Sequence, residues 1–264
     1  MGNELVLNEL TLVENRLYSL FKADNSILCE ILNFLKLPSK RIRSVLALLY
    51  LKANNAGIND EIITVLTVGE LIHNASLIHD DIIDSADMRR NSQSLNKKFN
   101  PKIAVLAGDF LLSLAGKMLI SVKNETIIAN FYNAAKLMTE AEIKQQLLLN
   151  KLPDSNEYID VCKGKTAALF SVLLESCAVL SDLDTNKAKN LGETFGFLFQ
   201  LKNDIEPNSA MTDKKNGVNT AMEIFGVEKT KALIHNYKEE ILGEVEDFPN
   251  IIYRRELEEL IRKL

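Results

Sequence analysis

Apolar residues recur along most of the chain at intervals of three and four positions, the spacing that gathers them on one side of an α-helix. The spacing predicts helices over 4–22, 25–36, 41–55, 59–82, 102–122, 125–149, 155–181, 186–206, 228–242 and 250–264. Residues that break helices fall between them, at Leu37-Pro38-Ser39, Asn54 to Asn59, Asn100-Pro101, Leu152-Pro153-Asp154 and Pro207 to Asn219. The short alternating runs that predict strands are lacking, so we expect an all-α fold.

Two of the predicted helices, 102–122 and 155–181, are apolar on more than one face. Such helices belong in the interior of a large helical bundle. The 264 residues of the chain suit one large domain or at most two. Because no internal repeat or low-complexity linker interrupts the sequence, we expect one domain over 1–264.

Composition limits the class of function. The net charge of −5 does not suggest a nucleic-acid surface, although local cation clusters remain suited to a small anionic ligand. The cysteines, Cys29, Cys162 and Cys177, form no CxxC pair and indicate free or buried thiols in a reducing compartment. The N-terminus lacks the basic start of a signal peptide, and no uninterrupted apolar run approaches the length of a membrane span. We therefore expect a cytoplasmic protein.

The strongest chemical signal lies in residues 71–90, LIHNASLIHDDIIDSADMRR. Asp80 and Asp84 are four positions apart and project from one face of a helix, where their charges repel. A divalent cation removes that repulsion, and Mg²⁺ typically binds one or two carboxylates together with water and phosphate oxygens. Arg89 and Arg90 follow with forked donors suited to phosphate. Because the preceding turns are apolar, the residues favour a magnesium–phosphate site over a solvated acidic surface.

Three other polar clusters interrupt apolar segments. Lys40 to Arg43 open a helix, whose N-terminus attracts anions, but a solvated helix start explains these cations as well. Lys165-Thr166 interrupts a strongly apolar helix, where a lysine either extends to solvent or pairs with an anion. Gln200 to Asp204 end another apolar helix, and by themselves they read as a polar last turn before Pro207.

Taken together, these stretches resemble the trans-isoprenyl diphosphate synthases, the polyprenyl synthetase family, across about residues 37 to 225. KRIR is similar to the GGKRIRP element of the family, and HNASLIHDDIIDSADMRR to its first aspartate-rich motif. AVLAGDFLLSLA resembles AVLxGDFLLxxA, AEIKQQL resembles GExxQL, KTAALF resembles KTAxLF, and FLFQLKND resembles the start of FQxxDDxxD. The six matches occur in the order of the family. They imply an isoprenoid synthase fold, a helical bundle around a deep apolar central cavity.

The resemblance implies a Mg²⁺-dependent prenyltransferase that joins isopentenyl diphosphate to an allylic diphosphate, head to tail and in the trans configuration. Carried over position by position, it assigns the magnesium ligands to Asp80, Asp84, Asn203 and Asp204, with Asp81 supporting them. Thr166 would lie near the reacting carbons, where the family stabilises positive charge.

The resemblance also assigns the two substrates to separate groups of residues. The allylic diphosphate would be contacted by Arg89, Lys165 and Gln200. Isopentenyl diphosphate would be held by Lys40, Arg43, His73 and Arg90. Beside these, His79 is expected to orient its neighbours, and His235 is expected to be structural.

Product length in this family depends on what blocks the cavity, and a bulky aromatic four or five positions before the first aspartate motif keeps products short. Those positions are Ser76 and Ala75 here, and both side chains are small. We therefore expect a product of C20 or longer. A lower floor is expected on the helix 102–122, at Leu112 or Leu119.

The second aspartate motif departs from the family. Its first aspartate is Asn203 and its last is Pro207, and the lysine of the following D-x₃-G-K-x-T tail is Val218. Asparagine still offers one oxygen to a metal but lacks the charge. An active synthase and a non-catalytic partner of an active homologue therefore both remain open. A class I terpene cyclase fits less well, because Pro207 and Met211 stand where its motif needs Ser or Thr and Glu.

Members of the family pair through apolar helices. We therefore expect a homodimer that uses 102–122 or 125–149, with a heteromer as the alternative.

Overall fold

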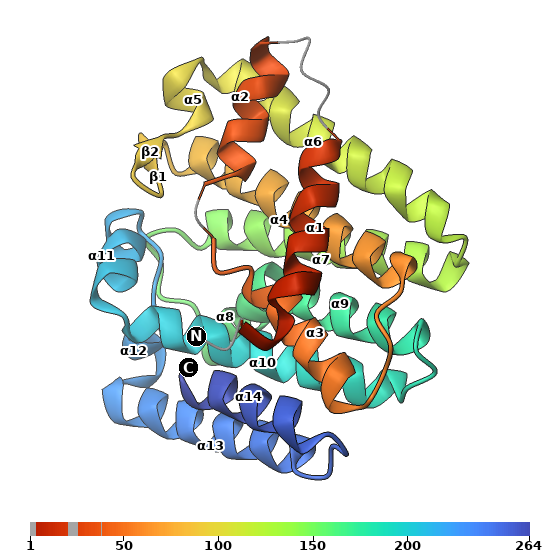
Figure 1. Cartoon of the computed structure of the whole chain (residues 1–264). Coiled ribbons are helices and arrows are strands. Elements are labelled where there is room, and N and C mark those ends of the chain that lie inside the picture. The colour runs from red at the N-terminus through yellow and green to blue at the C-terminus, as the bar shows by residue number, and fades with distance from the viewer. Residues whose placement is uncertain (1–3, 21–25, 38) are drawn as a thin grey trace. The chain divides into compact units, whose positions relative to one another are not determined.

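The computed structural model describes residues 4–20, 26–37 and 39–264, and it is almost wholly helical (Figure 1). The all-α prediction is confirmed. Residues 21–25, where the predicted helices 4–22 and 25–36 end and begin, lie outside the described residues, as does Pro38 of the predicted break Leu37-Pro38-Ser39.

Two compact units make up the chain. The N-terminal unit comprises the described residues of 3–45 together with 58–124, and the C-terminal unit comprises 46–57 and 125–264. The chain passes from one to the other within α3, after Val45.

The N-terminal unit is built around a long central helix, α4, which packs against α6 and α1 (Figure 1). Its elements are η1 (Glu4–Val6), α1 (Leu7–Ser19), α2 (Ser26–Leu35), the start of α3 (Ile42–Ala53), α4 (Asp60–Ile83), β1 (Met88–Arg89), β2 (Ser92–Gln93), α5 (Leu95–Lys98) and α6 (Pro101–Val122). Asparagine side chains begin both long helices: Asn59 accepts a hydrogen bond from the Ile62 N–H, and Asn100 from the Ile103 N–H. These caps explain why the predicted starts at 59 and 102 are nearly right.

A short antiparallel hairpin follows α4 and was not predicted. Met88 pairs with Gln93 and Arg89 with Ser92, and Arg90 and Asn91 turn the chain with positive φ angles of 49° and 65°. Two-residue strands carry too few side chains to show an alternating pattern. The hairpin places Arg89 and Arg90 close after the end of α4.

The C-terminal unit holds the remaining helices. They are α7 (Glu125–Leu147), α8 (Ser155–Cys162), η2 (Lys163–Ala167), α9 (Ala168–Val179), α10 (Thr185–Ile205), α11 (Pro207–Lys215), α12 (Ala221–Phe225), α13 (Val227–Val245) and α14 (Ile251–Arg262). At the C-terminal end α13 packs against α14, and α10 packs on both α9 and α13 (Figure 1).

The segment predicted as one helix over 155–181 is interrupted by a turn of π-helix, η2. Here the Ala168 N–H donates to the Lys163 carbonyl, five residues back instead of four. After this insertion α9 is buried on nearly every face, as the apolar pattern predicts. Such π-helical turns are frequent at functional sites, and this one contains Lys165 and Thr166.

The stretch from Pro207 to Asn219, predicted to be a break, is largely helical. Pro207 is the first residue of α11, a position where its missing N–H costs nothing. Thr220 then begins α12, and its backbone N–H donates to the Glu223 side chain, 2.9 Å away. Proline and polar residues therefore mark helix starts here, where the sequence pattern suggested a loop.

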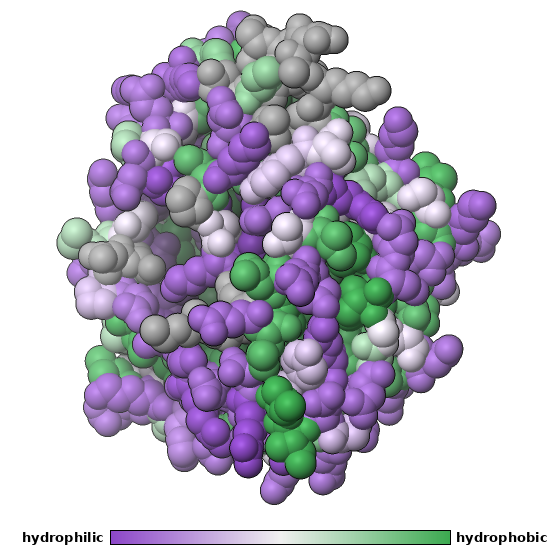
Figure 2. All heavy atoms as spheres, viewed as in Figure 1, coloured by the Kyte–Doolittle hydropathy of each residue, from purple (hydrophilic) through white to green (hydrophobic). Residues whose placement is uncertain are grey.

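Two helices, α4 and α6, are long and apolar enough by length and composition to cross a membrane. The apolar window of α4 is 78% buried inside the protein, as in a core helix, whereas that of α6 is only 33% buried. The prediction that 102–122 is buried on more than one face was therefore wrong for this chain. On the face shown in Figure 2 polar side chains predominate and hydrophobic ones gather in smaller patches.

Candidate functional site

The first aspartate motif occupies the C-terminal end of α4. Asp84 caps the helix, and its N–H donates to the Asp80 carbonyl at 2.8 Å. Asp80 is partly exposed and Asp84 is exposed, whereas Asp81 is only 1% exposed. Asp80 and Asp84 lie one turn apart on the same side of the helix, as predicted, and Asp81 points into the unit.

Asp81 forms an ion pair with Arg89 of the hairpin. Its backbone carbonyl accepts a hydrogen bond from the Asn96 side chain at 3.2 Å. Burial raises the pKa of Asp81, and the guanidinium of Arg89 opposes that rise. The second carboxylate oxygen, Oδ2, is buried and receives no hydrogen bond from the described residues. Asp81 therefore fixes the position of Arg89 in this structure, and its predicted role in supporting the magnesium ligands stays a prediction.

The KRIR element divides into one structural and two outer cations. Arg41, with a positive φ of 47°, is 6% exposed and forms an ion pair of 2.8 Å with Glu70 of α4, itself 2% exposed. Ser44 donates to the same carboxylate at 2.8 Å. Arg41 therefore holds the start of α3 on α4, while Lys40 is exposed and Arg43 is partly exposed.

His73, on α4, lies among guanidinium groups. Burial lowers its pKa well below the ordinary value, and the nearby charges of Arg43, Arg90, Arg41 and Arg89 lower it further. Burial also lowers the pKa of Arg43 to about 10, against the opposing effect of Glu70. The structure thus brings together Arg43, His73, Arg89 and Arg90, four of the five residues predicted to bind diphosphate in this unit, in one cationic cluster. The fifth, Lys40, is exposed, and its predicted contact stays a prediction.

His79 sits where α4 crosses α6. Its Nε2 lies 3.3 Å from the Val105 carbonyl and 3.6 Å from Asp109 Oδ1. A Cβ added at Gly108 would lie 2.2 Å from this nitrogen, so only glycine leaves room for the ring. The first aspartate motif and the GDFLL segment therefore depend on each other for packing, in line with the orienting role predicted for His79.

Of the residues predicted to set product length, Ala75 is completely buried, and the Ser76 hydroxyl donates to the His73 carbonyl at 2.9 Å. Leu119 is 2% exposed, whereas Leu112 is 39% exposed on the outer face of α6. Leu112 was therefore a wrong choice for a cavity floor within this chain, because an exposed side chain cannot close an interior cavity.

In the C-terminal unit Lys165 forms an ion pair with Glu142 of α7. Glu142 also accepts a hydrogen bond from Gln146 at 2.8 Å. The structure thus joins the KTAALF and AEIKQQL motifs through one lysine and one carboxylate. Sequence reasoning matched AEIKQQL to the family but gave Glu142 no role, and a carboxylate on an apolar helix was the signal that could have found it.

Thr166, Gln200 and Asp204 are linked by hydrogen bonds. The Thr166 hydroxyl donates to Gln200 Oε1 at 2.8 Å, and Gln200 Nε2 donates to Asp204 Oδ1 at 2.7 Å. Asp204 Oδ2 accepts from the Tyr158 hydroxyl and from the Ala221 N–H, both at 2.6 Å. Burial raises the pKa of Asp204, and these hydrogen bonds oppose the rise.

These contacts bear on the predicted metal ligands. Asp204 is 3% exposed and has both carboxylate oxygens bonded to the protein, whereas Asn203, one residue earlier, is partly exposed. Among the described residues no three His, Cys, Asp or Glu side chains are grouped as ligands of one metal ion. Two carboxylates are nevertheless what Mg²⁺ takes when a substrate supplies phosphate oxygens, so Asp80 and Asp84 fit a magnesium–diphosphate site.

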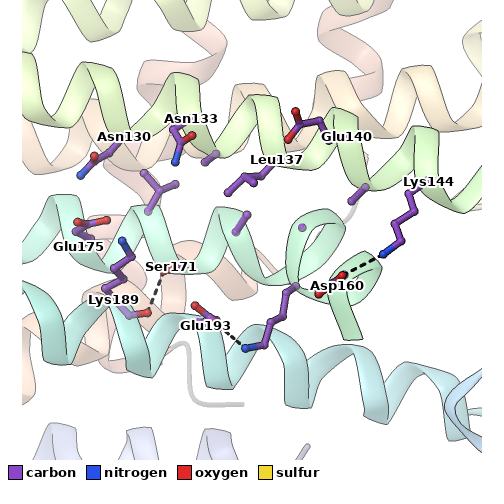
Figure 3. Close-up of a pocket in the computed structure, with 16 residues that line it drawn as sticks. Asn130, Asn133, Leu137, Glu140, Lys144, Asp160, Ser171, Glu175, Lys189 and Glu193 are labelled. Atoms are coloured by element: carbon purple, nitrogen blue, oxygen red, sulfur yellow. Dashed lines mark hydrogen bonds and ion pairs between the residues drawn. The ribbon is translucent and has the colours of Figure 1, made fainter. Parts of the chain in front are cut away.

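A groove of about 420 Å³ runs in the C-terminal unit between α7 and the helices η2, α9 and α10 (Figure 3). Ion pairs flank it, Lys144 with Asp160 at 3.0 Å and Lys163 with Glu193 at 2.6 Å. None of the predicted site residues lines it. Apolar side chains such as Leu137 and Val172 line the groove beside these charges. The predicted apolar central cavity stays a prediction.

Comparisons with known proteins extend these observations. A model of the family described as polyprenyl synthetase matches residues 25–251. The chain is 33% identical over 244 residues to a prenyl transferase of Cyanidium caldarium, covering 86% of this chain and 76% of the relative. It is 32% identical over 202 residues to octaprenyl diphosphate synthase of Haemophilus influenzae, covering 74% of this chain and 60% of that one. The crystal structure of geranyltranstransferase from Thermotoga maritima superposes with a TM-score of 0.83 at 28% identity, over 96% of this chain and 97% of that one.

Proposed function

The chain belongs to the polyprenyl synthetase family, and on that premise we propose that it is a prenyltransferase. It condenses isopentenyl diphosphate with an allylic diphosphate, head to tail and in the trans configuration, and releases a polyprenyl diphosphate of C20 or longer. A single domain over 1–264 is kept as part of the proposal, because the family match runs through both units.

The observation that carries the proposal is the cationic cluster of the N-terminal unit. Arg43, Arg89 and Arg90 surround a histidine whose own pKa is lowered, so that it adds no further charge. Two buried carboxylates, Glu70 and Asp81, offset part of this charge, but the four guanidinium groups around His73 outnumber them, so the cluster keeps an excess of positive charge that needs a further anion. A diphosphate meets that need, and forked guanidinium groups bind its oxygens in pairs.

The exposed carboxylates of Asp80 and Asp84 stand at the end of the same helix. They would hold Mg²⁺ shared with the allylic diphosphate. Asn203 is kept as a predicted magnesium ligand because it occupies the first position of the second aspartate motif. Bound there, Mg²⁺ neutralises charge on the departing diphosphate. Both carboxylate oxygens of Asp204 accept hydrogen bonds from the protein, which argues against Asp204 as a magnesium ligand and supports a positioning role for it.

Each remaining residue has a part in the reaction. Arg89, positioned by Asp81, binds the allylic diphosphate and stabilises the charge that develops when the C–O bond breaks. Lys165 is kept as a predicted contact of this diphosphate because of its place in the KTAALF motif. The amide of Gln200 is bonded to Thr166 and Asp204, which supports a positioning role for Gln200 in place of the predicted diphosphate contact. Lys40, Arg43, His73 and Arg90 orient isopentenyl diphosphate so that its double bond adds to C1 of the allylic cation. The Thr166 hydroxyl lies near that cation. The proton lost from the new chain passes to the released diphosphate.

Product length follows from the small side chains before the first aspartate motif. Ala75 is completely buried and Ser76 turns its hydroxyl back to the helix backbone, so neither supplies a bulky floor near Asp80. A chain of C20 or longer then ends at a lower obstacle, for which Leu119 is the buried candidate on α6.

We propose a homodimer formed through the exposed face of α6. Val105, Leu106, Leu112 and Ile120 lie on one side of this helix and are between 39% and 68% exposed. Exposed apolar residues grouped in this way commonly mark a protein interface, and the polar Asp109 and Ser113 lie among them. Cytoplasmic location remains part of the proposal.

The alternative, a non-catalytic partner of an active synthase, rests on Asn203 and Pro207. Pro207 has a structural reason, since it begins α11. The relatives that the chain matches carry the names of transferases and synthases. These two points support an active enzyme.

The test is turnover by the purified chain with Mg²⁺, labelled isopentenyl diphosphate and, separately, C10, C15 and C20 allylic diphosphates. Labelled products of C20 or more are expected, and Asp80→Asn and Asp84→Asn should lose them. Asp87→Asn is the matched control. Asp87 lies three residues after Asp84, is also exposed, and pairs with Lys97. No incorporation by a folded wild-type chain would favour the partner-subunit alternative, and a C15 endpoint would overturn only the product length.

A further inference from the structure

In the hydrogen bonds that link Asp204, Gln200 and Thr166, the groups around Asp204 determine which atom donates and which accepts. The Ala221 N–H can only donate, so Asp204 Oδ2 must accept. An ionised carboxylate accepts at both oxygens, so Gln200 must turn its NH₂ group to Oδ1. The amide oxygen of Gln200 then faces Thr166, whose hydroxyl is left as the donor.

This direction decides what Thr166 offers to a substrate. Its one proton is used toward Gln200, so the other sides of the oxygen carry only lone pairs. Lone pairs are attracted to a positive charge, whereas a hydroxyl proton is repelled by it. Thr166 is 8% exposed, and in such surroundings the orientation of one dipole has a larger effect than in water.

We propose that Asp204 is a positioning residue of prenyl transfer, which sets the Asp204–Gln200–Thr166 hydrogen bonds so that Thr166 turns lone pairs to the allylic cation. The inference rests on the proposed function. It gives the second aspartate motif a role in positioning Thr166. This role does not require the two aspartates that are replaced here by Asn203 and Pro207. The Ala221 N–H holds the carboxylate in place, and the Tyr158 hydroxyl adds a second hydrogen bond to the same oxygen that the direction does not depend on.

Asp204→Asn reverses the direction of the Asp204–Gln200–Thr166 hydrogen bonds. Tyr158 and Ala221 still require an acceptor, so the amide oxygen of the new side chain faces them and its NH₂ group faces Gln200. The Gln200 amide then turns over, donates to Thr166, and frees the Thr166 proton toward the substrate. We expect kcat to fall by about tenfold to a hundredfold, with KM for both diphosphates unchanged within about twofold.

The direction is restored by exchanging the two groups in the double variant Asp204→Asn/Gln200→Glu. The new amide at position 204 then donates to the new carboxylate at position 200, which accepts from Thr166 as Gln200 does in the wild type, and the net charge is unchanged. The double variant should recover kcat by at least about fivefold over Asp204→Asn.

Tyr158→Phe is the control for the loss of a buried hydrogen bond. Ala221 and Gln200 still define the direction of the hydrogen bonds in this variant, so we expect kcat within about threefold of the wild type. The lost hydrogen bond should lower the melting temperature. If Asp204→Asn fails to fold, Thr166→Val leaves Asp204 intact and should lower kcat by about tenfold, whereas Thr166→Ser should retain it.

The experiment measures kcat, both KM values and thermal melting for the wild type and these variants with Mg²⁺, labelled isopentenyl diphosphate and a C15 allylic diphosphate. A wild-type chain without incorporation would overturn the proposed function and this inference with it. An active wild type in which the double variant is no faster than folded Asp204→Asn would overturn the inference alone. The same holds for a Thr166→Val variant with unchanged kcat.

Discussion

Replacing Gly108 by alanine tests whether the first aspartate motif and the GDFLL segment are packed against each other. A Cβ at position 108 would lie 2.2 Å from Nε2, 2.6 Å from Cδ2 and 2.8 Å from Cε1 of His79. Ordinary van der Waals contacts begin near 3.4 Å, so the ring must move by about 1 Å or leave its position. Because His79 precedes Asp80, this movement displaces the end of α4.

Two effects of opposite sign contribute to the free energy of unfolding. Overpacking of this kind typically costs about 1–3 kcal/mol. In a helix interior alanine is favoured over glycine by about 1 kcal/mol, and this gain does not depend on His79. Gly108→Ala should therefore destabilise the wild type by up to about 2 kcal/mol. In the background of His79→Ala, where the ring is absent, the same change should stabilise by up to about 1 kcal/mol.

A double-mutant cycle measured by urea unfolding separates these effects, because the alanine preference cancels in the difference between the two backgrounds. The expected coupling is about 1–3 kcal/mol, with the double variant more stable than Gly108→Ala alone. If Gly108→Ala changed stability by the same amount with and without the His79 ring, the two helices would not meet as the structure shows.

Three further predictions concern the same unit. Arg41→Met should cost about 3–5 kcal/mol in urea unfolding, because it leaves the buried Glu70 carboxylate with the Ser44 hydroxyl but without the charge of Arg41. Arg41→Met/Glu70→Leu should recover most of that loss, and equal losses in both variants would contradict this. His73 should make unfolding pH-dependent, because burial and the charge of Arg43 lower its pKa in the folded state. Below pH 6.5 the unfolded chain therefore binds a proton that the folded state does not bind. The free energy of unfolding falls by up to about 1.4 kcal/mol per pH unit in that range. His73→Gln should remove that part of the slope, and an unchanged slope would show that the histidine is not buried among cations. Leu106→Glu should convert the proposed dimer to a monomer in light scattering, whereas Leu152→Glu, at another exposed leucine, should not, and an unchanged mass for Leu106→Glu would place the interface elsewhere.

The helical fold could be predicted because periodic apolar positions and helix caps act locally. Asn59 and Asn100 mark helix starts in the sequence and serve as caps in the structure. The hairpin at Arg89 and the helix at Pro207 could not be predicted in the same way. Two-residue strands are too short for a period, and a proline indicates either a break or a first helical position, depending on the residues after it.

The predicted site residues were chosen by type and position, and the structure adds what each one touches. Arg41 and Arg43 look equivalent in KRIR, and both charges act on His73, yet the 2.8 Å ion pair with the buried Glu70 belongs to Arg41. That difference depends on a carboxylate on another helix, 29 residues away in the sequence. No local pattern contains that information.

The same reasoning applies to the two aspartate motifs. Asp80 and Asp84 keep exposed or partly exposed carboxylates, which a metal shared with a substrate requires. Asp204 instead has its oxygens filled by Tyr158, Ala221 and Gln200. A carboxylate already bonded on both oxygens loses these bonds if it turns to a metal, at a cost of about 1–3 kcal/mol for each buried donor left without a partner. The loss of an acid at Asn203 therefore weakens one metal contact but leaves intact the hydrogen bonds that reach Thr166, so a degenerate motif is compatible with an active enzyme.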